Sequence, residues 1–240
     1  LDRADVFAQA SGKFQAACYK EEIEANLRTP GLAGFQLLDL HDYVGQGTAL
    51  VGVLDPFWEE KGYIGAEQWR RFCDTTVPLA VLKKRVFRTD EPFDIEVLAA
   101  HYGQDDLTAA RVYWRIEDAA GEVAAEGRLP VARISQGSGI ELGRLEADLS
   151  QLAAPEAYRL VIGLEGTGFE NDWDFWVYPA AISETASGDI LVTRSFEKAV
   201  ERLGEGGKVL FVPAYHELTW DSPPIGRRPI FWNRLMGPNW

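Results

Sequence analysis

The sequence has few cysteines, few histidines and a shortage of basic residues, and each shortage excludes a class of protein. Its 240 residues include 2 cysteines and 3 histidines, with 24 Lys plus Arg against 37 Asp plus Glu. Two cysteines cannot build a disulfide framework, and both Cys18 and Cys73 lie in segments of helical pattern, where small buried side chains are expected. This cysteine count leaves the compartment open.

The charge balance argues against anionic partners. A formal net charge of -13 repels the phosphate backbone of nucleic acids and the headgroups of anionic lipids. No apolar run reaches the roughly 18 residues of a membrane-spanning helix. Neither a G-x-G-x-x-G pattern nor a Walker lysine is present, so "GQGT" at residues 45–48 is interpreted as a turn. We therefore expect no nucleic-acid partner, no membrane contact and no cofactor.

Apolar and aromatic residues are plentiful. Hydrophobic residues make up 46% of the chain and aromatic residues 12%, including 8 Trp, which is typical of a folded protein with a large core. The chain begins at Leu1, and its last 14 residues, "RRPIFWNRLMGPNW", contain three aromatic residues and no terminating turn. We therefore expect a portion of a larger protein.

The first of three pieces, residues 1–76, has an α/β pattern. Apolar residues recur at spacings of three and four over residues 5–27, which predicts a helix that ends at the Thr-Pro-Gly breaker, 29–31. The apolar run 31–40 has the length of a buried strand, and residues 65–74 predict a second helix. Helix followed by buried strand is typical of a parallel α/β layer. This pattern predicts a piece that needs neighbouring strands from elsewhere.

The second and third pieces are predicted from a change of period. Residues 77–180 contain seven segments of strand length, separated by Asp, Gly and Pro turns, which predicts an antiparallel β-sandwich of the immunoglobulin-like, disulfide-free kind. Residues 181–240 contain a strand, a helix and a strand over 188–213, which predicts the start of a further α/β or accessory domain.

Three polar residues, Asp39, His41 and Asp42, lie at the carboxyl end of the predicted strand 31–40. Polar groups at the carboxyl end of a buried parallel strand are where α/β barrels place substrate contacts. The alternative is a structural role, in which the neighbouring acids or backbone groups hold the histidine in place. A metal site is less expected, because His101 and His216 lie in other pieces with no ligand spacing.

Two further segments have open interpretations. The stretch "DPFWEEKGYI", residues 55–64, carries three aromatic side chains. Two interpretations are open for them: stacking on a sugar ring, or packing in a domain interface. The stretch "KEEIEAN", residues 20–26, predicts a solvated acidic helix face with local ion pairs. In residues 169–179, two Trp at a spacing of three favour core packing or docking onto the preceding piece over ligand stacking.

Two stretches of the sequence carry a resemblance to a known family. They are residues 20–64, which include "AGFQLLDLHDYVGQGT", and residues 164–179, which include "FENDWDFWVYP". They resemble a C-terminal portion of glycoside hydrolase family 2, the β-galactosidase and β-glucuronidase group. The resemblance implies the last helix and strand of a (β/α)8 barrel, residues 1–76, followed by the sandwich, and it covers most of the chain. The tryptophan-rich strand of familiar β-galactosidases is absent from this stretch, which leaves the sugar undetermined.

The resemblance also implies a mechanism for the parent enzyme. Retaining enzymes use two carboxylates about 5 Å apart, and in this family both would precede residue 1. The chain would then contribute one wall of the sugar pocket, with Asp39, His41, Asp42, Gln46 and Trp58 as substrate contacts. The resemblance implies two partners, a carbohydrate and the remainder of the polypeptide. It also implies a periplasmic or extracellular location for the parent enzyme. The alternatives are a non-catalytic carbohydrate-binding or interaction module and a small esterase-type hydrolase.

Overall fold

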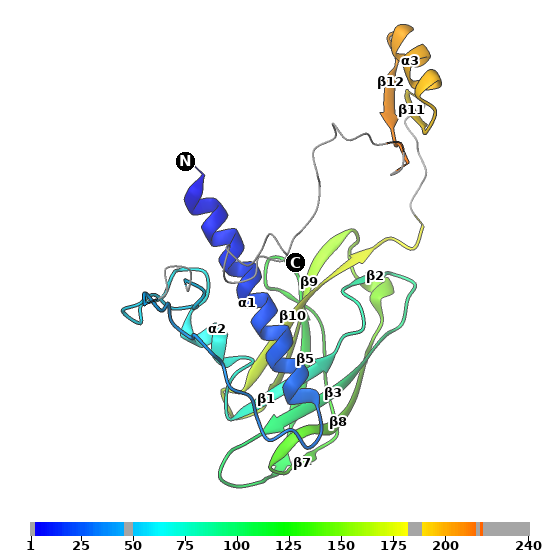
Figure 1. Ribbon diagram of the computed structural model, residues 1–240. Helices are drawn as coiled ribbons and strands as arrows, with labels where there is room; N and C mark the ends of the chain where they lie inside the picture. The colour runs from blue at the N-terminus through cyan, green and yellow to red at the C-terminus, as the bar shows by residue number, and fades with distance from the viewer. Residues whose placement is uncertain (1–2, 46–49, 182–188, 215–216, 218–240) are drawn as a thin grey trace. The chain divides into compact units, whose positions relative to one another are not determined.

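The computed structural model describes residues 3–45, 50–181, 189–214 and 217. Contacts between residues divide the chain into two compact units, residues 1–180 and 181–240. The first unit contains a long helix, an irregular segment and a β-sandwich (Figure 1). Each unit is described below by itself.

Helix α1 (Ala4–Arg28) confirms the helix predicted for residues 5–27. It ends where Thr29 donates its hydroxyl to the Ala25 carbonyl at 2.8 Å and Pro30 prevents a further turn. Gly31 then takes a left-handed φ of 76°, which glycine adopts without steric cost. The carboxyl half of α1 lies over the sandwich, and the amino half extends beyond it (Figure 1).

The sandwich has one sheet of three strands and one of five. The smaller sheet has the order β1 (Thr76–Val81), β3 (Phe93–His101), β8 (Gly137–Ala147). The larger has the order β2 (Val86–Arg88), β10 (Glu170–Tyr178), β9 (Glu156–Leu164), β5 (Val112–Glu117), β6 (Val123–Arg128). All pairs in these two sheets are antiparallel except β2 with β10. Short additions are α2 (Ala66–Arg70), the β4 (Leu107–Ala110) and β7 (Ala132–Ile134) pair and the 3-10 turn Leu149–Gln151.

The core explains why these strands were recognisable from their pattern. Strands β5 and β10 alternate between buried and more exposed side chains, with Ile116 and Phe175 pointing into the main core. Strand β1 is buried on nearly every residue, because α1 covers its outer face. Ile23 and Leu27 of α1 pack there with Leu79 in a second cluster. Sandwich content is therefore present as predicted.

The carboxylate of Glu24 joins α1 to both sheets. It is fully buried, and its Oε1 accepts from Lys20 Nζ at 2.6 Å and from Asn171 Nδ2 at 2.8 Å. Its Oε2 accepts from Trp173 Nε1 at 2.9 Å and Arg28 Nη1 at 3.1 Å. Because Asn171 Nδ2 also donates to the carbonyl of Pro78 in β1 at 3.0 Å, one carboxylate connects α1, β1 and β10.

The burial of Glu24 shows that the solvated acidic face predicted for residues 20–26 is wrong at this position. Glu21 and Glu22 are exposed, as a solvated face requires. The partners of Glu24 in β10 lie 147 and 149 residues further along the chain. Local spacing could not reveal them.

The second unit is a small α/β element. Strands β11 (Ile190–Thr193) and β12 (Lys208–Phe211) pair in parallel, and α3 (Phe196–Gly204) connects them. Ser195 caps α3 by accepting from the Lys198 N–H at 3.3 Å. The strand, helix and strand predicted for residues 188–213 are therefore present.

The barrel end predicted for residues 1–76 is wrong. Up to residue 75 the described residues contain two helices and no strand, and the run 31–40 makes no ladder. The nearest features are two isolated bridges, His41 with Leu54 and Leu54 with Glu60. An isolated apolar run cannot form a strand without neighbours that accept its backbone hydrogen bonds. The predicted helix over 65–74 is also shortened to the five residues of α2.

The described residues form three α-helices. Among them, none is both long and apolar enough to cross a membrane. Helix α1 has 25 residues, but acidic and basic side chains interrupt its apolar ones.

We predict that Glu24→Ala destabilises the first unit strongly. Removing one partner of a buried ion pair costs about 3 to 5 kcal/mol, because the remaining donors lose their acceptor. Urea unfolding followed by tryptophan fluorescence measures the change. The control is Glu22→Ala, which removes an exposed glutamate from the same helix. Equal unfolding free energies for the two variants would contradict the prediction.

Candidate functional site

The irregular segment between α1 and β1 is held on the amino half of α1. Gln9 Nε2 donates to the Lys61 carbonyl at 3.0 Å, and Gln15 Nε2 donates to the Val51 carbonyl. The ring of Tyr63 lies against the helix backbone at Gly12, where an added Cβ would come within 2.2 Å of it. A glycine is required there, so α1 and this segment pack as one body.

Hydrogen bonds among Asp42, Gly52, Lys61 and Tyr63, which we call the staple, join two parts of the segment. The side chain of Asp42 is 8% exposed and accepts from the Gly52 N–H at 3.0 Å and from Lys61 Nζ at 2.7 Å. Lys61 Nζ also donates to the Gly52 carbonyl at 2.7 Å, and Tyr63 Oη donates to the same carbonyl at 3.2 Å. Burial, and then the negative charge of Asp42, raises the pKa of Tyr63, so its hydroxyl stays protonated as a donor.

His41 and Trp58 form an aromatic pair beside this staple. Their ring centroids are 4.5 Å apart and the planes are inclined by 41°. His41 Nδ1 lies 2.8 Å from the backbone oxygen of Asp42. Because a carbonyl oxygen only accepts, Nδ1 carries the proton, and in the neutral ring Nε2 is then an acceptor. The pair therefore offers an aromatic surface and a hydrogen-bond acceptor side by side.

The backbone at Trp58 is strained. Trp58 has a φ of 69°, which is rare for a bulky side chain, and 60% of the residue is exposed. Asp55 builds the turn by accepting from the N–H groups of Phe57 at 2.8 Å and Glu59 at 2.9 Å. Because strained backbone conformations cluster at functional sites, Trp58 is a candidate ligand contact.

The structure brings together three of the predicted substrate contacts, His41, Asp42 and Trp58. Asp39 lies at a half-buried position with a φ of 61°, which is outside the extended conformation of a strand. Gln46 lies outside the described residues. Their roles as substrate contacts stay predictions.

The sequence interpretation missed Lys61 and Gly52, which build the staple together with Asp42 and Tyr63. Lys61 lies in the quoted stretch 55–64, among the aromatic residues predicted as contacts, one of which is Tyr63. Nothing in the local pattern indicates that Lys61 pairs with an acid 19 residues earlier. Within the described residues, no group of three His, Cys, Asp or Glu side chains is placed to hold a metal ion.

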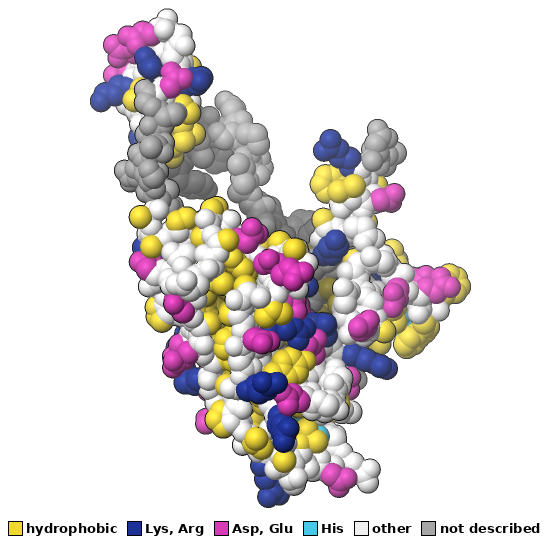
Figure 2. Space-filling model, turned by 180° about the vertical axis from the view of Figure 1, so that it is seen from behind, with side chains coloured by type: hydrophobic (Ala, Val, Ile, Leu, Met, Phe, Trp, Pro, Cys, Tyr) yellow, Lys and Arg dark blue, Asp and Glu magenta, His cyan; other side chains and the backbone are white. Residues whose placement is uncertain are grey.

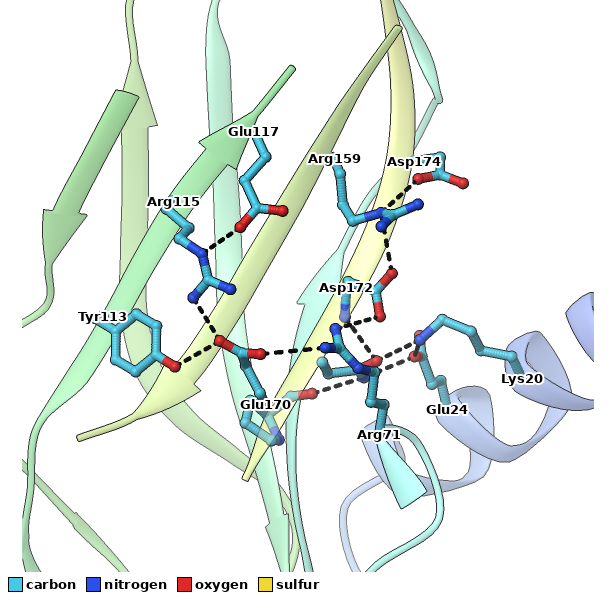
Figure 3. A network of polar contacts seen from close by, with 12 residues as sticks. Lys20, Glu24, Arg71, Tyr113, Arg115, Glu117, Arg159, Glu170, Asp172 and Asp174 are labelled. Atoms are coloured by element: carbon cyan, nitrogen blue, oxygen red, sulfur yellow. Dashed lines mark hydrogen bonds and ion pairs between the residues drawn. The ribbon is translucent and has the colours of Figure 1, made fainter. Parts of the chain in front are cut away.

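A second polar cluster lies on the outer face of the five-stranded sheet (Figure 3). Arg115 pairs with Glu117 at 2.5 Å and with Glu170, which also accepts from the Tyr113 hydroxyl at 2.6 Å. Tyr113 reaches Glu170 across Gly163, where an added Cβ would come within 2.4 Å of its hydroxyl oxygen. The glycine thus permits the ring to cross the intervening strand.

The same cluster continues along β10. Arg71 donates to Asp172 at 3.0 Å and to Glu170 at 3.4 Å, while Arg159 pairs with Asp172 at 3.4 Å and Asp174 at 3.0 Å. Burial raises the pKa of Glu170, but hydrogen bonds from Arg115 and Tyr113 outweigh it and lower the pKa below its usual value. Cations and anions alternate, so the cluster is largely self-neutralised.

Comparison with known families gives one match. The model of a domain of unknown function, DUF8488, matches residues 91–179, which lie in the sandwich and make up less than half of the chain. No curated protein matches the chain.

Solved structures show only weak likeness. Salmonella α2-macroglobulin reacted with methylamine is 16% identical with a TM-score of 0.35, over 50% of this chain and 8% of that one. The CARDB domain of a Pyrococcus furiosus protein, in complex with di-metal ions, is 11% identical with a TM-score of 0.32, over 44% and 92%. A Parabacteroides merdae β-glucuronidase is 14% identical with a TM-score of 0.28, over 43% and 13%.

These likenesses carry no argument about family or function. The match spans 6% of the α2-macroglobulin of E. coli and 8% of the Salmonella protein. The β-glucuronidase is a weak structural neighbour, and membership of glycoside hydrolase family 2 stays a prediction.

We predict that Gly52→Ala opens the staple. Its Cβ would lie 2.3 Å from the carbonyl carbon of His41 and 2.5 Å from the Asp42 nitrogen, and backbone cannot move aside cheaply. Trypsin cleavage after Lys61 should then accelerate at least about tenfold, the effect of a loss of about 1.4 kcal/mol in local stability. Gly168→Ala is the matched control, because no atom lies within 4 Å of its added Cβ. Equal cleavage rates would refute the clash.

We predict that Glu170 contributes to acid sensitivity. Its pKa in the folded protein is lowered from 4.5, so its stabilisation is present at higher pH and is lost as pH falls through the lowered pKa. Between roughly pH 6 and pH 3 the unfolding free energy should therefore decrease less steeply in Glu170→Gln than in the unsubstituted protein. Glu146→Gln, an exposed glutamate of β8, is the control. Parallel pH profiles for all three proteins would contradict the role of Glu170.

Proposed function

We propose that the segment 39–63 binds carbohydrate and that this chain contributes a sugar-contact surface to a glycoside-processing protein. The observation that carries the proposal is the exposed indole of Trp58, held at a φ of 69° and packed on His41. The apolar face of a pyranose ring can pack on such an exposed aromatic ring, because both are flat and partly apolar. The hydroxyls of the sugar then meet polar groups at the rim.

The polar groups beside Trp58 suit an uncharged ligand. His41 Nε2 accepts a hydrogen bond in the neutral ring, while Asp42 and Lys61 already neutralise each other at 2.7 Å. An anionic ligand would meet the net charge of -13, and a cationic one would have to displace Lys61. A neutral sugar avoids both costs, so it is the ligand class that we propose.

The proposed role is binding and not bond cleavage. Retaining glycoside hydrolysis needs a nucleophile and an acid/base about 5 Å apart. Asp42 is 8% exposed on its side chain and is held by Lys61 and the Gly52 N–H, which favours a structural role for this carboxylate. In this proposal any catalytic carboxylates come from another part of the parent polypeptide.

The second proposed partner is the remainder of the same polypeptide. Apolar side chains around the segment are strongly exposed: Leu38 at 77%, Val44 at 70%, Leu50 at 60% and Phe57 at 81%. We infer that these side chains form part of an interface, because large exposed apolar surfaces mark interaction sites. This observation also favours the alternative of an interaction module.

We predict that Trp58→Ala weakens sugar binding. Isothermal titration calorimetry with cellohexaose, xylohexaose and mannohexaose should detect affinities of about 1 mM, and the variant should lose at least about tenfold. The control is Phe57→Ala, which removes a more exposed ring from the same turn without removing the ring that packs on His41. Its affinity should change less than about twofold.

Two outcomes would contradict this proposal. One is an unchanged affinity in Trp58→Ala. The other is hydrolysis of nitrophenyl esters that His41→Ala abolishes, which would favour the esterase alternative.

A further inference from the structure

The outer face of the sandwich contains a pocket that shares no residue with the segment 39–63. Its volume is about 450 Å³, within the roughly 300 to 1,000 Å³ typical of small-molecule sites. Trp176 of β10 forms one wall, and the turn between β5 and β6, residues 118–121, forms another. Arg159, Asp174 and Glu117 complete the lining on the side of the charged cluster.

Strand register explains why this space is open. Trp176 of β10 lies opposite Ala157 of β9, and residues two apart on a strand share a face. The side chain of Ala157 ends at Cβ, so it leaves the flank of the indole uncovered. Trp176 is 43% exposed. Asp118 fixes the opposite wall by accepting from the N–H groups of Ala120 and Glu122, each at 2.9 Å.

A polar row borders the indole. Arg159 lies opposite Glu117 on one side and Asp174 on the other, because the three occupy paired positions of β5, β9 and β10. Figure 3 shows these three side chains on the same face of the sheet. Arg159 and Asp174 are half exposed or more, at 51% and 60% of their side chains. Donors and acceptors are therefore accessible next to an apolar ring.

The charges of this row are already paired. Arg159 binds Asp174 at 3.0 Å, and Glu117 binds Arg115 at 2.5 Å. A charged ligand would have to break one of these pairs, whereas neutral hydroxyls can donate to Asp174 and accept from Arg159 without doing so. On the face drawn in Figure 2, acidic and basic side chains are likewise interspersed. The pocket favours a neutral ligand with one apolar face and adjacent hydroxyls.

We propose that this pocket is a second carbohydrate site, in which a neutral pyranose packs on Trp176 and hydrogen-bonds to Arg159 and Asp174. It rests on its own cavity and register and not on the function proposed for residues 39–63. Trp173, three residues earlier in β10, is 2% exposed and donates to Glu24. Only Trp176 of this pair is available to a ligand.

Calorimetric titration of the 240-residue chain with cellohexaose, xylohexaose and mannohexaose tests the proposal. Trp176→Ala should lose at least about tenfold in affinity for the sugar that binds, and Trp176→Phe should recover part of the loss. The control is Tyr178→Ala, an exposed aromatic residue of β10 outside the pocket. Because Trp176 is exposed, the unfolding midpoint of Trp176→Ala should equal that of the unsubstituted protein. This measurement separates lost binding from lost folding.

The two proposed sites are distinguished by crossing the variants. If both bind, Trp58→Ala and Trp176→Ala each remove one of two binding events. If only the sandwich pocket binds, Trp58→Ala leaves the titration unchanged and Trp176→Ala abolishes it. An unchanged titration in Trp176→Ala, or no heat with any of the three sugars, overturns the second site. Heat with a lysine-rich peptide that Trp176→Ala abolishes, without sugar binding, also overturns it.

Discussion

The arrangement of the first unit depends on one buried carboxylate. Glu24 is fully buried, yet both of its oxygens accept two hydrogen bonds, from Lys20 and Asn171 and from Trp173 and Arg28. A buried charge is tolerated only when it is paired and hydrogen-bonded. The directions of these bonds determine where α1 sits over β1 and β10, because apolar packing alone would permit the helix to slide.

Through α1, that anchor also positions the candidate site. The described residues of the segment, 39–45 and 50–63, form no ladder with the sandwich sheets. Gln9, Gln15 and the close contact at Gly12 attach the segment to the amino half of the helix. A displacement of α1 would therefore carry the His41 and Trp58 pair with it. Side-chain to backbone bonds replace here the backbone ladder that a barrel strand would supply.

Much of the fold was predictable because its signals are local. Period-two alternation identifies β5 and β10, and spacings of three and four identify α1. The strand predicted for residues 31–40 is wrong because an apolar stretch of strand length does not specify a pairing partner. The strands that a barrel would need are not among the described residues. In the candidate site, Asp39, His41 and Asp42 were predictable as polar residues at the end of an apolar run. The pairing of Asp42 with Lys61 was not, because it depends on how the intervening turn folds.

The two tryptophans of β10 show how one strand supplies both a structural side chain and an exposed one, for which we propose a binding role. Their spacing of three places them on opposite faces, since successive side chains alternate. Trp173 points inward and donates to Glu24, so its polar edge is used by the anchor. Trp176 points outward beside Ala157, and its neighbours Arg159 and Asp174 neutralise each other. Both proposed sites therefore combine an exposed indole with already paired charges, which selects against ions and in favour of neutral ligands despite the acidic surface of the whole chain.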